Sequence, residues 1–265
     1  MTDLIKARTS ILENACSDLS AMKGVSGLFL GGSLADDSAD CYSDIDLRVV
    51  VEDQHFLDVV GGRENAPVHW GDFLFHETIG PNLTVSYYRP FNKIDLFYYK
   101  VSELSASPWY SLPTKILLDN KNIIANILNK SKDLKFEVSN IEILNLNRKA
   151  VAIITEVVKR IARGEYLYAH RMTTNLVEVV LGINDCLDGV PPLGSSKFIG
   201  REETAVKTKL ATLSFARENQ ISDLKTLIDI VSKNVELVGV EQLPCALQIA
   251  SDELDKLSGS KNSKI

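Results

Sequence analysis

The sequence is poor in cysteine, and its cysteines are not paired. It has four, at positions 16, 41, 186 and 245, and none lies in a Cys-x-x-Cys arrangement. A thiolate zinc site needs such pairs, and a small secreted scaffold needs a much denser set of cysteines. We therefore expect isolated reduced thiols, as in a cytosolic protein.

The sequence also lacks a long apolar run. No stretch approaches the ~20 apolar residues that cross a bilayer. The first six residues, MTDLIK, have neither the basic flank nor the apolar core of a secretory signal. We therefore predict a cytoplasmic location and no membrane partner.

The sequence also lacks a long basic run. The formal net charge is −6, and no basic run is longer than a few residues. A duplex or a long RNA requires a basic face, so a nucleic-acid partner is disfavoured. The chain has 265 residues, 45% of them hydrophobic and 24% charged, which is an ordinary globular composition with room for one large domain or two modest ones.

One pattern in the first fifth of the chain suggests chemistry. Residues 28–33 read LFLGGS, and residues 45–51 read IDLRVVV. An apolar run that enters a glycine turn is typical of a buried strand, and the second run predicts another strand. Asp44 and Asp46 stand two residues apart at its start, so their side chains point to the same face. Both carboxylates should therefore face the space beside Gly32 and Ser33.

Two such close carboxylates repel each other unless a cation lies between them. Mg²⁺ binds oxygen ligands and keeps substrate phosphates in its coordination shell. A glycine turn offers backbone N–H groups that a phosphate can approach without meeting a Cβ. The pattern therefore predicts a nucleoside-triphosphate site at Gly32, Ser33 and Asp44, with Mg²⁺ held by Asp44 and Asp46.

Asp95 is the candidate for a third carboxylate. A phosphoryl-transfer site commonly needs one, either to complete the metal coordination or to take a proton from the attacking hydroxyl. Asp95 is flanked by Ile94 and Leu96 in a predicted strand, where an acid is usually avoided unless the face is wet or functional. We interpret it as a base, a metal ligand or both; the alternative is a solvent-facing acid on an edge strand.

The two halves of the chain differ in pattern. The first half predicts a helix at 3–22, strands at 25–30 and 45–51, a possible short strand at 70–75, and a hairpin of 83–89 with 94–100. A capping box of Ser139 and Glu142 opens a helix that ends at Gly164. Further helices are predicted at 165–188, 202–216, 221–237 and 243–257, followed by a frayed tail. We predict an α+β protein with two domains: a nucleotidyltransferase catalytic domain at 1–137, built on a small mixed sheet, and an acceptor-binding domain at 138–265, built as a helical bundle.

The conjunction of strand, Gly-Gly-Ser, ten-residue gap and Asp-x-Asp strand resembles the nucleotidyltransferase superfamily that includes DNA polymerase β. Five residues match its motif position by position: Gly32, Ser33, Asp44, Asp46 and Asp95. The stretch at 42–47, YSDIDL, is most similar to the bacterial nucleotidyltransferases that modify aminoglycoside or lincosamide antibiotics. The specific motifs lie within residues 28–97, and the helical second half also suits these enzymes. The resemblance implies that the first two aspartates hold Mg²⁺ and that the third acts as base or metal ligand.

Other residues have two interpretations each. Arg48, on the same face as Asp44 and Asp46, could contact phosphate or form an ion pair with these two aspartates. The segment at 163–171, RGEYLYAHR, resembles Arg-Gly-Glu segments in the helical domains of the antibiotic-modifying enzymes, although capping and surface pairing would also explain it. Lys115 and Lys121 could contact the triphosphate or be ordinary residues of a surface helix. Trp109 and Tyr110 could line a nucleotide or acceptor pocket or fill the space between the domains.

The sequence as a whole predicts a Mg²⁺-dependent nucleotidyltransferase. An acceptor hydroxyl would attack the α-phosphorus of a nucleoside triphosphate, with ATP the expected nucleotide. The acceptor could be an aminoglycoside, a lincosamide, another small hydroxyl compound or a protein hydroxyl. Two alternatives stay open: a nucleic-acid-directed transferase, and a catalytically silent binding or antitoxin-like module that keeps the fold.

Overall fold

A computed structural model describes residues 2–192, 204–239 and 242–261. The chain divides into two compact units, Met1–Leu134 and Lys135–Ile265. The domain boundary predicted between residues 137 and 138 lies close to this division. The roles assigned to the two domains stay predictions.

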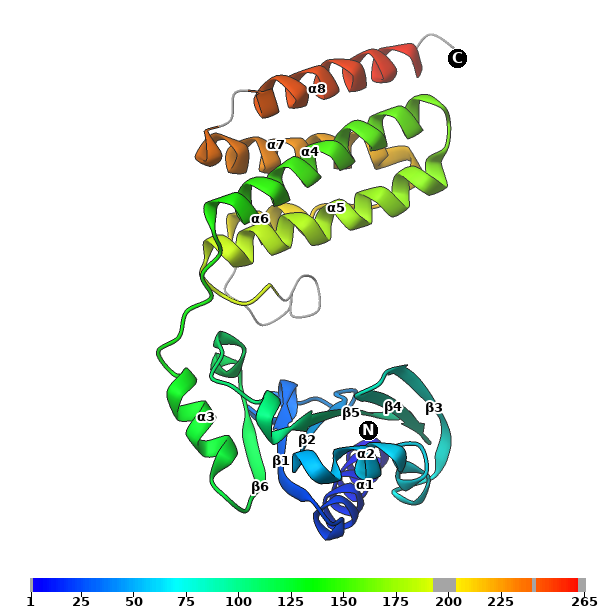
Figure 1. Cartoon of the computed structure of the whole chain (residues 1–265). Helices are drawn as coiled ribbons and strands as arrows, with labels where there is room; N and C mark the ends of the chain where they lie inside the picture. Colours follow the sequence, from blue (N-terminus) through cyan, green and yellow to red (C-terminus); the bar gives the residue numbers. More distant parts are fainter. Residues whose placement is uncertain (1, 193–203, 240–241, 262–265) are drawn as a thin grey trace. The chain divides into compact units, whose positions relative to one another are not determined.

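The first unit is built on one mixed sheet (Figure 1). The strands are ordered β3-β4-β5-β2-β1-β6, and β2 runs parallel to β5 while the other neighbours are antiparallel. Their bounds are Val25–Gly31 for β1, Ile45–Val51 for β2, Phe73–Gly80 for β3, Leu83–Tyr88 for β4, Asn92–Lys100 for β5 and Lys115–Asp119 for β6.

The two faces of this sheet differ because side chains alternate along each strand. Helices α1 (Thr2–Ala21) and α2 (Phe56–Gly61) pack on the face formed by apolar residues of the central strands, among them Ile45, Leu47, Ile94 and Leu96. The opposite face carries Asp46, Arg48 and Asp95. Helix α3 (Ile123–Ser131) contributes to a small cluster on that face with Phe29 and Val50. Asp46, near the start of β2, and Asp95, near the start of β5, lie outside this cluster.

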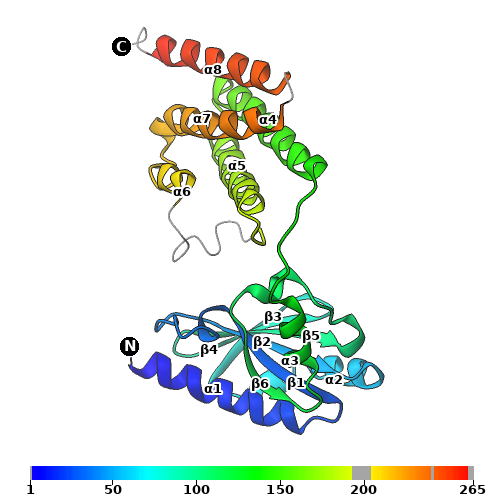
Figure 2. The same cartoon turned by 90° about the vertical axis from the view of Figure 1, so that its left-hand side faces the viewer.

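The second unit is helical (Figure 2). Its helices are α4 (Asn140–Ala162), α5 (Tyr166–Leu187), α6 (Ala205–Leu210), α7 (Gln220–Val238) and α8 (Gln242–Lys261). The predicted capping box opens α4: Ser139 Oγ accepts the Glu142 N–H, and the Glu142 carboxylate accepts the Ser139 N–H at 2.9 Å. These helices bury their own apolar core, which includes Ile154, Val157, Leu176, Leu227 and Leu254. The α+β class, with a mixed sheet followed by a helical bundle, is confirmed.

Some predicted elements are wrong in their bounds. The strand predicted at 70–75 begins only at Phe73, because Trp70 has helical φ and ψ as the C-cap of the 3-10 helix Ala66–His69. The Trp70 side chain is buried, and its indole N–H donates to Asp18 at 2.9 Å. The helix predicted at 202–216 ends at Leu210, and residues 202–203 lie outside the described residues. After it, the buried Asp223 carboxylate accepts the backbone N–H groups of Ser214 and Phe215 and holds a loop.

The tail is helical for longer than predicted, since α8 continues to Lys261; residues 262–265 lie outside the described residues. The sequence interpretation missed α2, β6 and α3 altogether. Among the described helices, none combines the length and the apolar character needed to cross a membrane.

Candidate active site

The glycine turn lies directly against the aspartate strand. Strand β1 ends at Gly31, and a short 3-10 helix, Gly32–Leu34, follows. A Cβ on Gly32 would lie 2.1 Å from Asp46 Oδ2, and one on Gly31 would lie 1.9 Å from Arg48 Nη1. Gly32 also has a φ of +63°, which a side chain disfavours. Gly32 is therefore the position that needs glycine, because a Cβ there would displace the Asp46 carboxylate and strain the backbone. Gly31 has an ordinary φ of −116°, and a Cβ there would have to displace only the end of the flexible Arg48 side chain.

Strand register brings the predicted acids together. Asp46 on β2 is the Cα partner of Asp95 on parallel β5, and Gly31 on β1 is the partner of Asp46 on its other side. Asp44 lies just before β2, and its side chain is 45% exposed, compared with 19% for Asp95. The sheet thus places the three predicted carboxylates at one edge of the face that α1 and α2 leave free. Ser33 is half-buried in the 3-10 helix that begins at Gly32.

Lys93 joins two of these acids. Its Nζ lies 3.0 Å from Asp44 Oδ2 and 3.2 Å from Asp95 Oδ2. Burial disfavours its charge, but the hydrogen bond to Asp44 and the attraction of Asp95 raise the pKa of Lys93 above its ordinary value. For Asp95, burial raises the pKa, Lys93 opposes this rise, and the nearby Asp46 and Asp44 charges add to it.

Sequence reasoning missed Lys93, because it assigned this residue to the turn of the hairpin. Strand β5 in fact begins at Asn92. The signal was present: Lys93 and Asp95 are two residues apart in one strand and therefore point to the same face. Only the register of β5 against β2 brings Asp44 within reach of the same ammonium group.

The carboxylates fit a magnesium ion whose remaining ligands come from the phosphates of a nucleotide. Asp95 Oδ1 is buried and has no hydrogen-bond partner in the described part of the chain. Within the same part, no three His, Cys, Asp or Glu side chains form a group that could hold a metal ion. A complete protein cage is not needed, because Mg²⁺ is usually bound by one or two carboxylates plus substrate phosphates. The roles of the predicted site residues stay predictions.

Arg48 lies farther along the same face. Its guanidinium carbon is 5.8 Å from the centre of the Phe29 ring and 5.3 Å from that of Phe97. The structure shows no ion pair between Arg48 and the aspartates among the residues it describes, so that interpretation is wrong. Nη1 is buried there without a partner. A contact with phosphate stays a prediction.

The other basic and aromatic candidates have neighbours or positions in the first unit that a structural role would explain. Lys115 begins β6 and does not lie on a helix, and Lys121 forms an ion pair with Glu52. The Tyr110 ring packs 6.2 Å from the Phe29 ring inside the first unit. The prediction that the aromatic pair fills a space between the domains stays a prediction.

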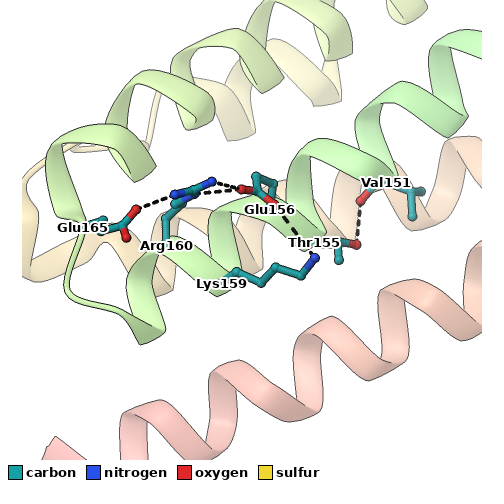
Figure 3. A network of polar contacts seen from close by, with 6 residues as sticks. All are labelled: Val151, Thr155, Glu156, Lys159, Arg160 and Glu165. Atoms are coloured by element: carbon teal, nitrogen blue, oxygen red, sulfur yellow. Dashed lines mark hydrogen bonds and ion pairs between the residues drawn. The ribbon is translucent and has the colours of Figure 1, made fainter.

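The segment at 163–171 forms the junction of α4 and α5 (Figure 3). Arg160 donates to Glu156 at 2.7 Å and to Glu165 at 2.6 Å, and it stacks over the Tyr168 ring at 4.5 Å. The surface pairing considered from the sequence is therefore present. The same segment also lines a cavity of about 1020 Å³, together with a loop that precedes α7. Its walls include Glu165, Tyr166, Tyr168, His170, Phe215 and Arg217.

With the geometry established, the comparisons with known proteins identify the family. A family model described as Streptomycin adenylyltransferase matches residues 6–182. The chain belongs to this family. It is therefore an adenylyltransferase of the nucleotidyltransferase superfamily, and both the predicted resemblance and the prediction of an enzyme are confirmed.

The adenylyltransferase also resembles several solved structures. An aminoglycoside 6-adenyltransferase from Bacillus subtilis is 11% identical with a TM-score of 0.34, covering 97% of this chain and 96% of the other. A spectinomycin adenyltransferase from Enterococcus faecialis, solved with ATP and spectinomycin, is 12% identical with a TM-score of 0.33, covering 96% and 99%. A c-di-GMP synthase from Capnocytophaga granulosa is 10% identical with a TM-score of 0.30, covering 100% and 84%. No curated protein matches. Family membership rests on the family model.

Proposed function

We propose that this adenylyltransferase transfers AMP from ATP, with Mg²⁺, to a hydroxyl group of a small molecule of the aminoglycoside or lincosamide class. One observation carries the proposal: the Asp46 carboxylate lies against the glycine turn at Gly32 and is paired in register with Asp95. The family supports adenylyl as the transferred group and an aminoglycoside as the first acceptor to test.

The residues divide the work of binding. Backbone N–H groups at Gly32 and Ser33, and the Ser33 hydroxyl, bind the β- and γ-phosphates. Asp44 and Asp46 hold Mg²⁺, which when bound neutralises the charge that develops on the phosphates.

Asp95 prepares the acceptor. Its carboxylate accepts the proton of the acceptor hydroxyl while the oxygen forms a bond to the α-phosphorus. The bond from this phosphorus to the bridging oxygen breaks, and pyrophosphate leaves with the electron pair. Burial raises the pKa of Asp95, and this makes its carboxylate a stronger base than an ordinary aspartate.

We assign acceptor recognition to the helical unit. Its cavity combines aromatic rings with hydrogen-bonding groups, including the Tyr166 and Tyr168 rings and the Glu165 carboxylate. Ligand pockets commonly have this mixture of an apolar wall and a few polar groups.

The test is an incubation of the purified protein with Mg²⁺ and each of the four nucleoside triphosphates, against a panel of aminoglycosides, lincosamides and other small hydroxyl compounds. Pyrophosphate release and a nucleotide adduct in the mass spectrum of one acceptor are the expected result, with Asp46→Asn as the inactive control. Nucleotide binding without any adduct would contradict the proposal and favour a silent module. Labelling of RNA alone would favour a nucleic-acid-directed enzyme.

A further inference from the structure

Lys93 lies where the cation of the site is expected to bind. Its ammonium group bridges Asp44 and Asp95 at 3.0 and 3.2 Å, and the side chain is only 26% exposed. Two of the three predicted carboxylates thus already have a positive partner supplied by the chain itself. A surface lysine gains little from one exposed carboxylate, but this ammonium contacts two, and one of them is largely buried.

The bridge has a consequence for a free metal ion. Mg²⁺ could use the bridged oxygens of Asp44 and Asp95 only after the ammonium group leaves them. Departure from both acids would leave a charged group in a partly buried place without partners, which is costly in free energy. The triphosphate of a nucleotide would remove this cost, because its oxygens offer the ammonium group a new anionic partner.

We propose that Lys93 is a resident counter-ion of the catalytic carboxylates, one that keeps free divalent cations out of the site and moves onto the triphosphate when metal and nucleotide bind together. The inference rests on the proposed function, since it takes the metal of that site as given. Lys93 then acts twice. It weakens the binding of the metal alone, and it strengthens the binding of the metal–nucleotide complex.

The experiment measures Mn²⁺ binding by electron paramagnetic resonance and calorimetry, on the full chain, with and without ATP. Lys93→Met keeps the length of the side chain and removes its charge. It should bind Mn²⁺ alone at least about tenfold more tightly than the wild type, which corresponds to ~1.4 kcal/mol. It should bind Mn²⁺–ATP at least about tenfold more weakly, because the triphosphate loses its ammonium partner.

Two variants serve as controls. Lys121→Met removes an ammonium group that pairs with Glu52 outside the site, and both affinities should stay at the wild-type values. Lys93→Arg restores the positive charge and should return the affinity for Mn²⁺ alone toward the wild type. If Lys93→Met does not fold, as judged by its circular dichroism and melting curve, Lys93→Gln replaces it with the same expectations.

The outcomes separate this inference from the proposed function. Unchanged or weaker binding of Mn²⁺ alone by the neutral variant would overturn the role of Lys93, as would unchanged binding of Mn²⁺–ATP. Asp46→Asn in the Lys93→Met background should abolish the tight Mn²⁺ site. If that site persists, the metal binds elsewhere and the proposed metal centre itself is wrong. If Asp46→Asn abolishes binding of Mn²⁺–ATP but Lys93→Met behaves as wild type, only the inference fails.

Discussion

At the scale of single residues, the site is determined by how closely a glycine and a carboxylate approach each other. A Cβ on Gly32 would force the Asp46 side chain to move, because Asp46 Oδ2 would lie 2.1 Å away. From the sequence, a glycine was expected at position 32 because a phosphate must approach the backbone there. The structure gives a second reason for glycine, the nearby Asp46 carboxylate. A change at either residue should therefore disturb the other.

Gly32→Ala should weaken ATP binding in the presence of Mg²⁺ by at least about tenfold, or ~1.4 kcal/mol. The new Cβ would push the Asp46 side chain aside and strain a backbone with a φ of +63°. Isothermal calorimetry gives the affinity. Gly80→Ala is the matched control, because no atom lies within 4 Å of a Cβ built at that glycine. Equal losses in both variants would contradict the expectation.

Asp46→Asn should abolish turnover and leave the fold at least as stable as in the wild type. Burial is the main cause that raises the pKa of Asp95, and the nearby Asp46 charge adds to it, so removing that charge relieves repulsion in the metal-free protein. Asp44→Asn should be equally inactive but gain less stability, since it also loses the ion pair with Lys93. Turnover assays and melting curves check both. A rate above about a tenth of wild type, a loss below ~1.4 kcal/mol, would refute the metal assignment.

Asp95→Asn should damage the chemical step more than binding. A general base contributes roughly 10²–10⁴ in rate, so we expect at least about a hundredfold loss in kcat, with the affinity for ATP in Mg²⁺ kept within about tenfold. In the wild type, activity should be lost as the pH falls through the raised pKa of Asp95, because only the carboxylate accepts a proton. Asp72→Asn, an exposed acid paired with Arg89, is the control. An unchanged kcat would make Asp95 a structural acid.

At the scale of elements, the strands that carry the site and the neighbouring β4 could be predicted from the sequence, whereas the edge strand β6 could not. Strands β1, β2 and β5 are runs of apolar residues with clear flanking signals. Strand β6 lies at the edge of the sheet, and the first three of its five residues are exposed, so it shows no alternation to read. Lys93 was missed because it was assigned to the hairpin turn. In addition, its partner Asp44 is far away in sequence and meets it only through the parallel pairing of β2 with β5.

The junction of α4 and α5 allows a prediction about pH. Hydrogen bonds from Arg160 hold the pKa of Glu156 below its ordinary value. A carboxyl whose pKa is lower in the folded state contributes stability above the unfolded pKa, and that contribution is lost as the pH falls through the folded pKa. Arg160→Met should therefore lower the melting temperature more at neutral pH than in acid.

Thermal melts across that range check this expectation. The part of the effect that persists in acid should reflect the lost stacking of Arg160 on Tyr168. Lys256→Met is the control. It also removes an ion pair on a helix surface, but its partner Glu253 lies in α8, so the contacts of Arg160 at the junction stay intact. A pH-independent loss at Arg160 would show that the ion pairs contribute nothing.

At the scale of the whole molecule, the chain has separate cores. The buried apolar residues of the first unit form clusters with no member beyond residue 128, whereas the cluster of the second unit begins at Leu146. Each unit therefore has what an independent domain requires, a core of its own and an ordinary domain size. Between α3 and α4, residues 134–138 have no regular secondary structure.

Limited proteolysis should cut the chain first between residues 131 and 140, because exposed segments without regular structure are cleaved most readily. The fragment of residues 1–134 should fold alone and still bind Mn²⁺–ATP, since every predicted metal and phosphate ligand belongs to it. It should not adenylylate an acceptor that the full chain modifies, and the helical fragment alone should bind that acceptor.

Mass spectrometry of the digest, circular dichroism of each fragment and calorimetry with ATP and with the acceptor test these statements. A first cut inside either core would contradict the division into two domains. If the first fragment binds the acceptor, the assignment of acceptor recognition to the helical cavity is wrong, and the sheet unit recognises the acceptor instead.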